Sequence, residues 1–282
     1  NCLPLQNKTV LVTRAASQAG DFCDRLHRQG ATVIEMPTLE IVSPSSWDPL
    51  DEAIAHLATF DWLILTSANG VHAFFDRLAQ SSTGTADLQT VKIAVVGKKT
   101  ARTLQEYQYT PDFTPPNFVA DSLISQFPEP ETLATAHILF PRVESGGRTV
   151  LVKEFTAKGA TVVEVPAYQS QCPKTVDSKT IKALEQHQID VVTFASSKTV
   201  RFFAQLVEAA LPNEAADNGA HDNTSPEPPI QACLKPVCIA SIGPQTTKTC
   251  QELFGRVDVE AEEYTLDGLM NAVIHWSQQS AP

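Results

Sequence analysis

The stretch that decides the fold reads Asp61-Trp62-Leu63-Ile64-Leu65-Thr66-Ser67-Ala68-Asn69-Gly70-Val71. A strand-length apolar run ends in small polar residues, and apolar residues at helical spacing follow at Phe74, Phe75 and Leu78. We therefore expect a strand that leads directly into the amino end of a helix. The first backbone N–H groups of such a helix are unpaired, and the helix dipole adds to their attraction for anions.

The chain repeats this stretch. Residues Asp190–Val200 show the same order of acid, apolar strand, polar turn and helix, 129 residues after Asp61–Val71. A second pair of segments is nearly identical at the same offset: Gly30–Pro37 reads Gly-Ala-Thr-Val-Ile-Glu-Met-Pro, and Gly159–Pro166 reads Gly-Ala-Thr-Val-Val-Glu-Val-Pro. The chain is therefore an internal duplication.

The later part of the duplication is spaced differently. Gly97 and Gly243 follow equivalent strands at an offset of 146, so the second copy holds 17 additional residues (146 − 129). We assign the surplus to Pro212–Pro236, which is rich in Asn, Asp, Pro and Ala without periodicity, and interpret it as a mobile surface loop. In both copies an aspartate, Asp121 or Asp267, is expected to open a final helix.

Each copy alternates strands and helices, a pattern typical of an α/β fold with a doubly wound parallel sheet. Two such domains from one duplication predict a cleft between them. Ligands of open α/β sheets bind beyond the carboxyl ends of the strands. The candidate substrate-binding residues therefore follow the strands, and they are Thr13, Arg14, Thr66, Ser67, Ala68, Asn69, Gly97, Lys98, Thr100, Arg142, Ser196, Ser197, Gly243, Pro244 and Thr246.

These residues also have explanations that need no ligand. The serines and the asparagine suit helix N-caps, where capping stabilises a helix by about 1 kcal/mol. The glycines and threonines suit turns. Arg14 and Arg142 suit the protein surface, but they occupy equivalent places after a first strand. Because guanidinium groups pair well with planar anions, the two arginines are also candidates for a carboxylate or phosphate clamp.

Tyr168 is the candidate catalytic residue. It follows Val165-Pro166-Ala167, where the second copy leaves its near-identical strand, and the first copy has Leu39 there. A tyrosine packed at a domain hinge is the alternative interpretation. A phenol can also donate a hydrogen bond to a leaving hydroxyl group.

Composition and charge narrow the function classes. A chain of 282 residues with 43% hydrophobic residues is long enough for two domains, and no apolar run approaches the ~20 residues of a membrane span. The net charge of −11 argues against nucleic acid but leaves a small anionic ligand open. The first residues lack an export pattern, and the six cysteines form no Cys-x-x-Cys motif, so we expect a reduced interior.

Nucleotide and metal motifs are not found either. The sequence has neither Gly-x-Gly-x-x-Gly nor the Walker pattern, so a dinucleotide or nucleoside triphosphate is poorly supported. The seven histidines show no metal-ligand spacing, and we expect no metal site. His72 and His137 are interpreted as surface residues or as satisfied core residues. No catalytic triad can be argued from residue order alone.

Several stretches together resemble the uroporphyrinogen-III synthase family, and the resemblance covers nearly the whole chain. They are Val10–Arg14, Trp62–Val71, Val96–Ala101, Gly159–Tyr168, Phe194–Ser197 and Ile242–Thr246. The chain departs from the family pattern at Ala15, where a proline often follows the arginine, and at Tyr107-Gln108, which replace a glycine. Neither departure falls on a residue proposed for chemistry.

The resemblance implies two domains joined by two crossing strands, with the first strand–helix unit of each repeat exchanged. Residues 1–37 and 170–282 would form one domain, and residues 38–169 the other. It also implies a hydro-lyase that cyclises hydroxymethylbilane to uroporphyrinogen III without a cofactor. In that reaction ring D is inverted through a spiro intermediate and water is lost.

The implied partner is the tetrapyrrole substrate, for which the resemblance suggests hand-over from hydroxymethylbilane synthase. We expect a monomer that binds neither nucleic acid nor membrane, in the cytoplasm or, in a plant or alga, in the plastid stroma. Two alternatives stay open. One is a two-domain protein that closes on a small anion without chemistry, and the other is a glycosyltransferase-like pair of Rossmann domains.

Overall fold

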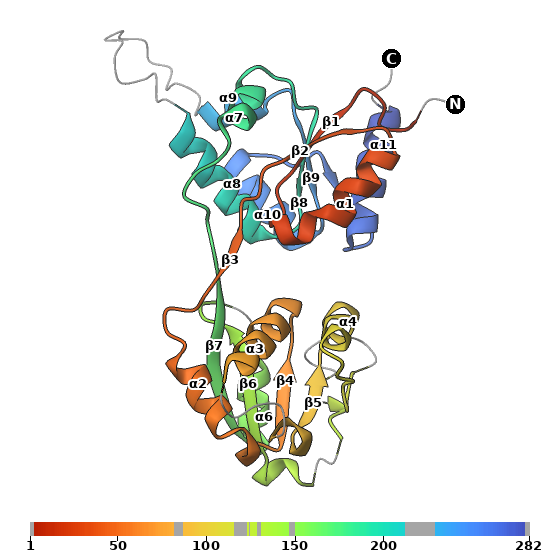
Figure 1. The fold of residues 1–282 in the computed structure, drawn as a ribbon. Coiled ribbons are helices and arrows are strands. Elements are labelled where there is room, and N and C mark those ends of the chain that lie inside the picture. Colours follow the sequence, from red (N-terminus) through yellow and green to blue (C-terminus); the bar gives the residue numbers. More distant parts are fainter. Residues whose placement is uncertain are drawn as a thin grey trace. The chain divides into compact units, whose positions relative to one another are not determined.

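A computed structural model describes residues 3–81, 87–115, 123, 125–128, 131–146, 150–211 and 229–279. The chain divides into two compact units (Figure 1). Unit 1 comprises Asn1–Glu40 with Gln171–Pro282, and unit 2 comprises Ile41–Ser170. The chain passes between the units within strand β3 (Glu40–Val42) and at the end of strand β7 (Thr161–Gln171). The sequence-based expectation set these boundaries at 37/38 and 169/170.

Unit 1 is a parallel sheet with helices on both faces. In its described part the strand order is β10-β9-β8-β1-β2, and every neighbouring pair is parallel. The strands are β1 (Thr9–Val12), β2 (Thr32–Glu35), β8 (Val191–Phe194), β9 (Cys238–Ser241) and β10 (Val259–Glu260). The helices are α1 (Ala16–Arg28), α7 (Ser178–Glu185), α8 (Ser197–Ala210), α9 (Pro229–Leu234), α10 (Pro244–Phe254) and α11 (Leu266–Gln279).

Alternating strand residues divide the core of unit 1 into two layers. Leu11 faces the layer that contains Phe203 of α8, whereas Val10 and Val12 face the layer that contains Phe22 of α1. Both layers are fully buried at these positions. Strands covered on both faces read as continuous apolar runs, which is why β1 shows no polar alternation.

Unit 2 repeats the arrangement. In its described part the strand order is β3-β7-β6-β4-β5, and the pairs from β7 to β5 are parallel. Its other strands are β4 (Trp62–Leu65), β5 (Lys92–Val95) and β6 (His137–Val143). Its helices are α2 (Asp48–Ala55), α3 (Ala68–Gln80), α4 (Lys98–Glu106) and α6 (Val150–Ala157), with 3-10 turns at Leu57–Thr59, Asp87–Thr90 and Leu133–Thr135.

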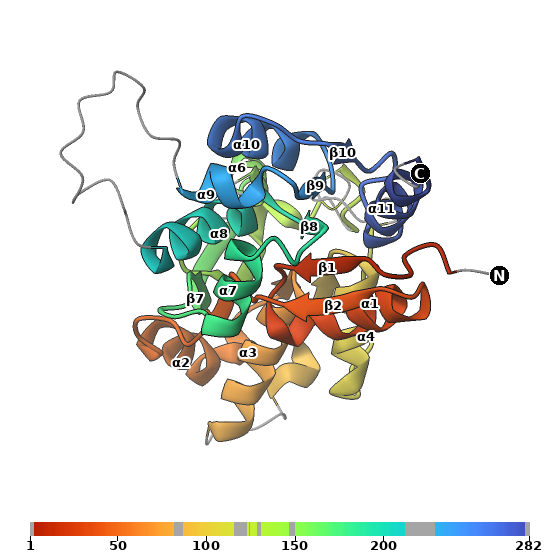
Figure 2. The ribbon, with the colours of Figure 1, turned by 90° about the horizontal axis from the view of Figure 1, so that it is seen from above.

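The two sheets are related by exchange of a strand–helix–strand unit. Strand β4 pairs with β6, which follows it in the chain (Figure 1). The equivalent β8 pairs with β1 from the start of the chain (Figure 2). Equivalent aspartates fix both pairings. Asp61 accepts a hydrogen bond from the backbone N–H of His137 at 2.8 Å, and Asp190 accepts one from that of Thr9 at 2.7 Å. The doubly wound α/β fold expected from the sequence is confirmed.

One predicted loop is partly wrong. We interpreted Pro212–Pro236 as a loop, but helix α9 occupies Pro229–Leu234. Ile230, Cys233 and Leu234 are buried in the layer around α8, and their i, i+3, i+4 spacing puts them on one face of a helix. Residues 212–228 lie outside the described part of the chain, as does the expected opening of a helix at Asp121.

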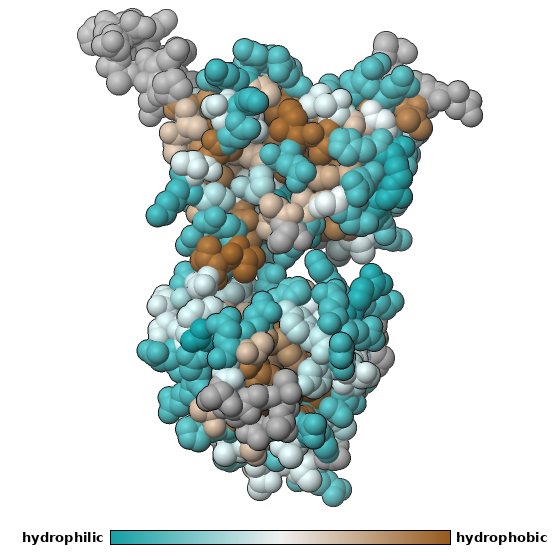
Figure 3. All heavy atoms as spheres, in the orientation of Figure 1, coloured by the Kyte–Doolittle hydropathy of each residue, from teal (hydrophilic) through white to brown (hydrophobic). Residues whose placement is uncertain are grey.

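The surface is mainly hydrophilic on the face drawn in Figure 3, where apolar residues form separate small groups. Among the described residues the exposed large hydrophobic side chains are Leu3, Val150 and Tyr264. Within the same residues, every helix falls short of the length and apolar character that a bilayer span requires.

Candidate active site

The stretch that opened the sequence analysis forms the carboxyl edge of the unit 2 sheet. Strand β4 is entirely buried, and α3 begins at Ala68 directly after it. Ser67 is the N-cap residue in an extended conformation, and its hydroxyl oxygen accepts a hydrogen bond from the backbone N–H of Gly70 at 3.0 Å. The predicted capping role of Ser67 is confirmed. Thr66, Ala68 and Asn69 around it are half-buried.

Tyr168 lies against this cap. Its phenol oxygen is 3.0 Å from the side-chain oxygen of Ser67, and either group can be the donor. A shift in the β6–β7 register sets the direction of the tyrosine side chain. Arg142 pairs with Pro166, but Val143 pairs with Tyr168. Such a bulge redirects the side chain that follows it. Tyr168 therefore leaves its strand with the phenol at the amino end of α3.

A cavity of about 190 Å³ opens beside the phenol. Tyr168 and Asn69 line it together with Trp47 and His72. Sequence reasoning proposed Tyr168 and Asn69 but missed Trp47 and His72. The signal for His72 was available, because residues three apart on a helix share a face, and Asn69 and His72 are both in α3.

Helix α4 begins differently from α3. Gly97 precedes it with φ of 98°, and no side chain caps the helix. Few residues other than glycine adopt this conformation. Lys98 is exposed, whereas Thr100 is 4% exposed. The Thr100 side chain is therefore packed inside, whereas the side chains of Lys98 and Lys99 are exposed at this helix start.

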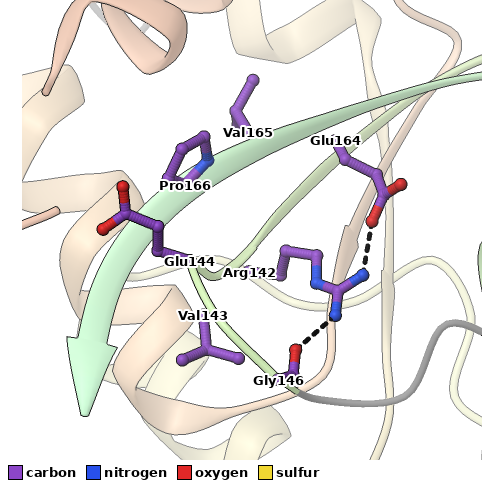
Figure 4. A pocket seen from close by; sticks show the side chains of 7 residues that line it. All are labelled: Arg142, Val143, Glu144, Gly146, Glu164, Val165 and Pro166. Carbon is purple, nitrogen blue, oxygen red and sulfur yellow. Dashed lines mark hydrogen bonds and ion pairs between the residues drawn. The ribbon is translucent and has the colours of Figure 1, made fainter. Parts of the chain in front are cut away.

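Arg142 lines a second cavity of unit 2, of about 360 Å³ (Figure 4). Its guanidinium forms an ion pair with Glu164 and donates a hydrogen bond to the carbonyl oxygen of Gly146 at 2.6 Å. Glu144 points away from it and accepts a hydrogen bond from the backbone N–H of Ser45, which lowers the pKa of Glu144. Arg142 thus already has an anionic partner.

The equivalent corner of unit 1 joins two helix amino ends. Ser196 caps α8 by accepting a hydrogen bond from the backbone N–H of Thr199 at 3.2 Å. Ser197 donates its hydroxyl to the carbonyl oxygen of Gln245 in α10 at 2.9 Å. Gly243 and the exposed Pro244 begin α10 without a side-chain cap. Unit 2 lacks this connection because Ala68 stands at the position of Ser197.

Three predicted binding residues are buried. Thr13 is 0% exposed and donates its hydroxyl to the carbonyl oxygen of Thr193 at 2.8 Å. Thr246 is 3% exposed, and its backbone N–H binds the carbonyl oxygen of Gly243. The Thr13 hydroxyl thus has a partner within the protein, and contact of Thr13, Thr100 and Thr246 with a ligand stays a prediction.

Arg14 follows β1 and turns onto its own helix. Its guanidinium donates hydrogen bonds to the carbonyl oxygen and the side-chain oxygen of Gln18, at 3.2 and 3.3 Å. Burial lowers the pKa of Arg14 from its ordinary value, although an arginine keeps its charge at neutral pH. Unlike Arg142, it binds neutral acceptors, so its charge stays available to an anion.

The fold and these corners define a class: a duplicated, doubly wound α/β protein with helix amino ends at the carboxyl edges of its sheets and a tyrosine–serine pair at one of them. The family model described as Uroporphyrinogen-III synthase HemD matches residues 21–271. The Uroporphyrinogen-III synthase of Synechococcus elongatus is 50% identical over 277 residues, which cover 98% of each chain. The chain therefore belongs to the uroporphyrinogen-III synthase family, whose reaction is the cyclisation of hydroxymethylbilane to uroporphyrinogen III.

More distant relatives belong to the same family. The Uroporphyrinogen-III synthase of Chlorobaculum parvum is 28% identical over 261 residues, covering 91% of this chain and 94% of its own. Among solved structures, uroporphyrinogen-III synthetase from Helicobacter pylori matches with a TM-score of 0.59 at 15% identity, covering 95% of this chain and 99% of its own. At that identity the structural likeness shows the fold. The family resemblance read from the sequence is confirmed.

Proposed function

We propose that this chain carries out the family's cyclisation with main-chain amides that hold the substrate and with Tyr168 as the group that assists departure of the hydroxyl. Hydroxymethylbilane loses its ring-A hydroxyl to give an azafulvene cation. Ring D attacks through its already substituted carbon and forms a spiro intermediate. Fragmentation and reclosure invert ring D, and uroporphyrinogen III and water are the products.

Binding is the larger part of the proposed task. The substrate carries eight carboxylates and closes to the wrong isomer by itself, so the protein has to hold it in a shape from which the spiro intermediate forms. The net charge of −11 disfavours long-range attraction of such an anion. Backbone N–H groups act at short range, and the amino ends of α4 and α10 carry no side-chain cap that would occupy them.

The contact of 3.0 Å between Ser67 and Tyr168 carries the proposal for the chemical step. The Ser67 oxygen accepts the N–H of Gly70, and its own proton is free to be donated to the phenol oxygen. The proton of Tyr168 is then available to the leaving hydroxyl. A positioned donor of this kind contributes on the order of 10²–10⁴ in rate.

The other proposed binding residues lie around the helix amino ends. We assign contacts with acetate and propionate groups to the half-buried or exposed Thr66, Ala68, Asn69, Gly97, Lys98, Ser196, Ser197 and Pro244. The buried Gly243 is included because it precedes the uncapped start of α10. Arg14 is the proposed cationic contact, because neutral oxygens hold its guanidinium. Arg142 would have to share its charge between Glu164 and the substrate.

The source of the substrate, the oligomeric state and the compartment are also proposals. We infer that the substrate is handed over from hydroxymethylbilane synthase and that the protein acts as a monomer in the cytoplasm, or in the plastid stroma of a plant or alga. The free thiols support a reducing compartment. Burial raises the pKa of Cys238 and of Cys250 to about 12, so both remain protonated.

The test is to incubate the protein with hydroxymethylbilane and to separate the product isomers. We expect faster ring closure than in buffer, with isomer III as the product. A protein that only closed on the anion would leave the spontaneous product, isomer I, at the uncatalysed rate.

A further inference from the structure

A series of hydrogen-bonded side chains in unit 2 connects the cavity beside Tyr168 with the carboxyl end of α4. His72 of α3 lies with its Nδ1 2.9 Å from the phenol oxygen of Tyr107, which follows α4. That phenol in turn donates a hydrogen bond to the carboxylate of Asp76 at 2.8 Å. Asp76 is four residues after His72, so both side chains leave the same face of α3.

The hydrogen bonds determine which atom of this series carries each proton. Tyr107 has one proton and gives it to Asp76, so its oxygen accepts at His72, and Nδ1 must carry a hydrogen. Burial and the hydrogen bond to Asp76 raise the pKa of Tyr107, so the phenol stays protonated. Within the described part of the chain, the other ring nitrogen of His72, Nε2, forms no hydrogen bond to protein.

Aromatic packing holds Tyr107, the middle residue of the hydrogen-bonded series His72–Tyr107–Asp76, in place. The Tyr107 ring stacks on Phe75, with centroids 4.8 Å apart and planes at 25°. Phe75 is buried in the core of unit 2, so the position of the phenol is fixed by the core rather than by the surface. His72 itself is exposed, and its ring lines the cavity of about 190 Å³ that Asn69 and Tyr168 also line.

We propose that His72 binds one carboxylate of the substrate as an imidazolium, with its ring oriented by Tyr107, whose phenol is held by Asp76. This inference rests on the proposed function and adds a binding residue to it. A neutral imidazole with a hydrogen on Nδ1 has only an acceptor at Nε2, whereas the imidazolium donates from both nitrogens. Binding of the polyanion is therefore coupled to uptake of a proton at His72.

The charges around His72 agree with this assignment. Asp76 faces it on α3, Tyr107 meets it from the end of α4 with Glu106 beside the phenol, and Tyr168 shares its cavity from β7. Neither tyrosine adds a positive charge that would oppose an imidazolium, and a substrate carboxylate in the cavity would favour it.

The experiment compares His72→Gln with the wild-type protein at about pH 6 and about pH 8.5, on either side of the range in which imidazoles titrate. At the lower pH we expect KM for hydroxymethylbilane to rise about tenfold in the variant, with kcat within about twofold. In the wild type KM rises between the two pH values, and in His72→Gln this rise is lost. A KM that does not respond to His72→Gln at either pH overturns the proposal.

Two further variants separate binding from structure. His56→Gln is the matched control, because His56 is an exposed histidine of unit 2 whose Nδ1 lies 2.9 Å from the Glu52 carbonyl oxygen of the preceding helix. We expect it to leave KM and its pH dependence unchanged. Tyr107→Phe keeps the aromatic packing and removes the phenol that contacts both His72 and Asp76. It should raise KM for hydroxymethylbilane, because the His72 ring loses the acceptor that orients it, and an unchanged KM contradicts the role of Tyr107.

Binding of uroporphyrinogen III distinguishes this inference from the proposed function. Calorimetry on the wild type and on His72→Gln should show weaker binding and loss of proton uptake in the variant. If the wild type formed no isomer III while this difference persisted, the proposed function would fail and the binding role of His72 would stand. Equal affinity and equal proton uptake overturn the inference even if turnover is normal.

Discussion

The side-chain oxygen of Ser67 lies 3.0 Å from the phenol oxygen of Tyr168, and among the described residues no tyrosine bonds to Ser196, the matching serine of the other repeat. Ser196 instead donates its hydroxyl to the side chain of Thr199 at 3.4 Å. Unit 2 has Gly70 at the position of Thr199, so the Ser67 proton has no such local acceptor. The duplication thus produced two similar helix caps and one tyrosine–serine pair.

Ser67→Ala should affect stability and chemistry together. The variant removes the cap of α3, which we expect to lower the free energy of unfolding by about 1 kcal/mol. It also removes the group that we propose donates to Tyr168, so kcat should fall about tenfold and the share of isomer I should rise. Urea unfolding and product analysis measure the two effects separately.

The matched control is Ser196→Ala. It removes an equivalent cap at α8 and should cost a similar free energy of unfolding, with its effect on turnover confined to KM. If both variants lowered kcat equally, the loss would belong to helix capping, and the contact with Tyr168 would have no separate role.

Gly97→Ala should be more damaging than Gly243→Ala. An L-residue at the φ of 98° of Gly97 is strained by about 1–3 kcal/mol, and the amino end of α4 would move with it. Gly243 has an extended φ of 166°, and an added Cβ would meet Cδ1 of Tyr264 at 3.0 Å. Tyr264 is 66% exposed, so its ring can swing away.

We therefore expect Gly97→Ala to lower the unfolding free energy and to raise KM several-fold, and Gly243→Ala to change stability by less than about 1 kcal/mol. Denaturant unfolding and steady-state kinetics test both. An unchanged KM in a destabilised Gly97→Ala protein would argue against substrate binding at the α4 amides.

Glu164→Gln tests whether Arg142 meets the substrate. The ion pair with Glu164 occupies the guanidinium of Arg142, whose side chain is only 13% exposed. Removing the carboxylate frees that charge, so KM for the anionic substrate should fall by about twofold to fivefold, while Arg142→Gln should raise it. If Arg142→Gln destabilises the protein and KM responds to neither substitution, Arg142 is a structural residue.

The backbone plan could be predicted from the sequence because it depends on local patterns and on repetition. The equivalence of Asp61 with Asp190 and of Ser67 with Ser196 was visible at an offset of 129. The pairing of β1 with β8 was not, since periodicity is the same whichever half supplies a strand. Only the family resemblance suggested the exchange.

The site was less predictable because the partners of its side chains depend on the tertiary structure. Arg14 and Arg142 are equivalent in sequence, yet one binds Gln18 and the other Glu164. Tyr107 looked like a mere departure from a family glycine. It is the phenol that orients His72, and the next residue, Gln108, adopts the positive φ of 67° that a glycine would take.

Replacing Tyr168 with phenylalanine tests the central claim most directly. The variant loses one oxygen and keeps the ring that packs on the unit 2 core, so its unfolding transition should stay close to that of the wild type. With hydroxymethylbilane as substrate, we predict that the rate of isomer III formation falls by at least about 100-fold and that isomer I accumulates. Near wild-type turnover to isomer III by a folded Tyr168→Phe protein would contradict the account and leave Tyr168 with a packing role.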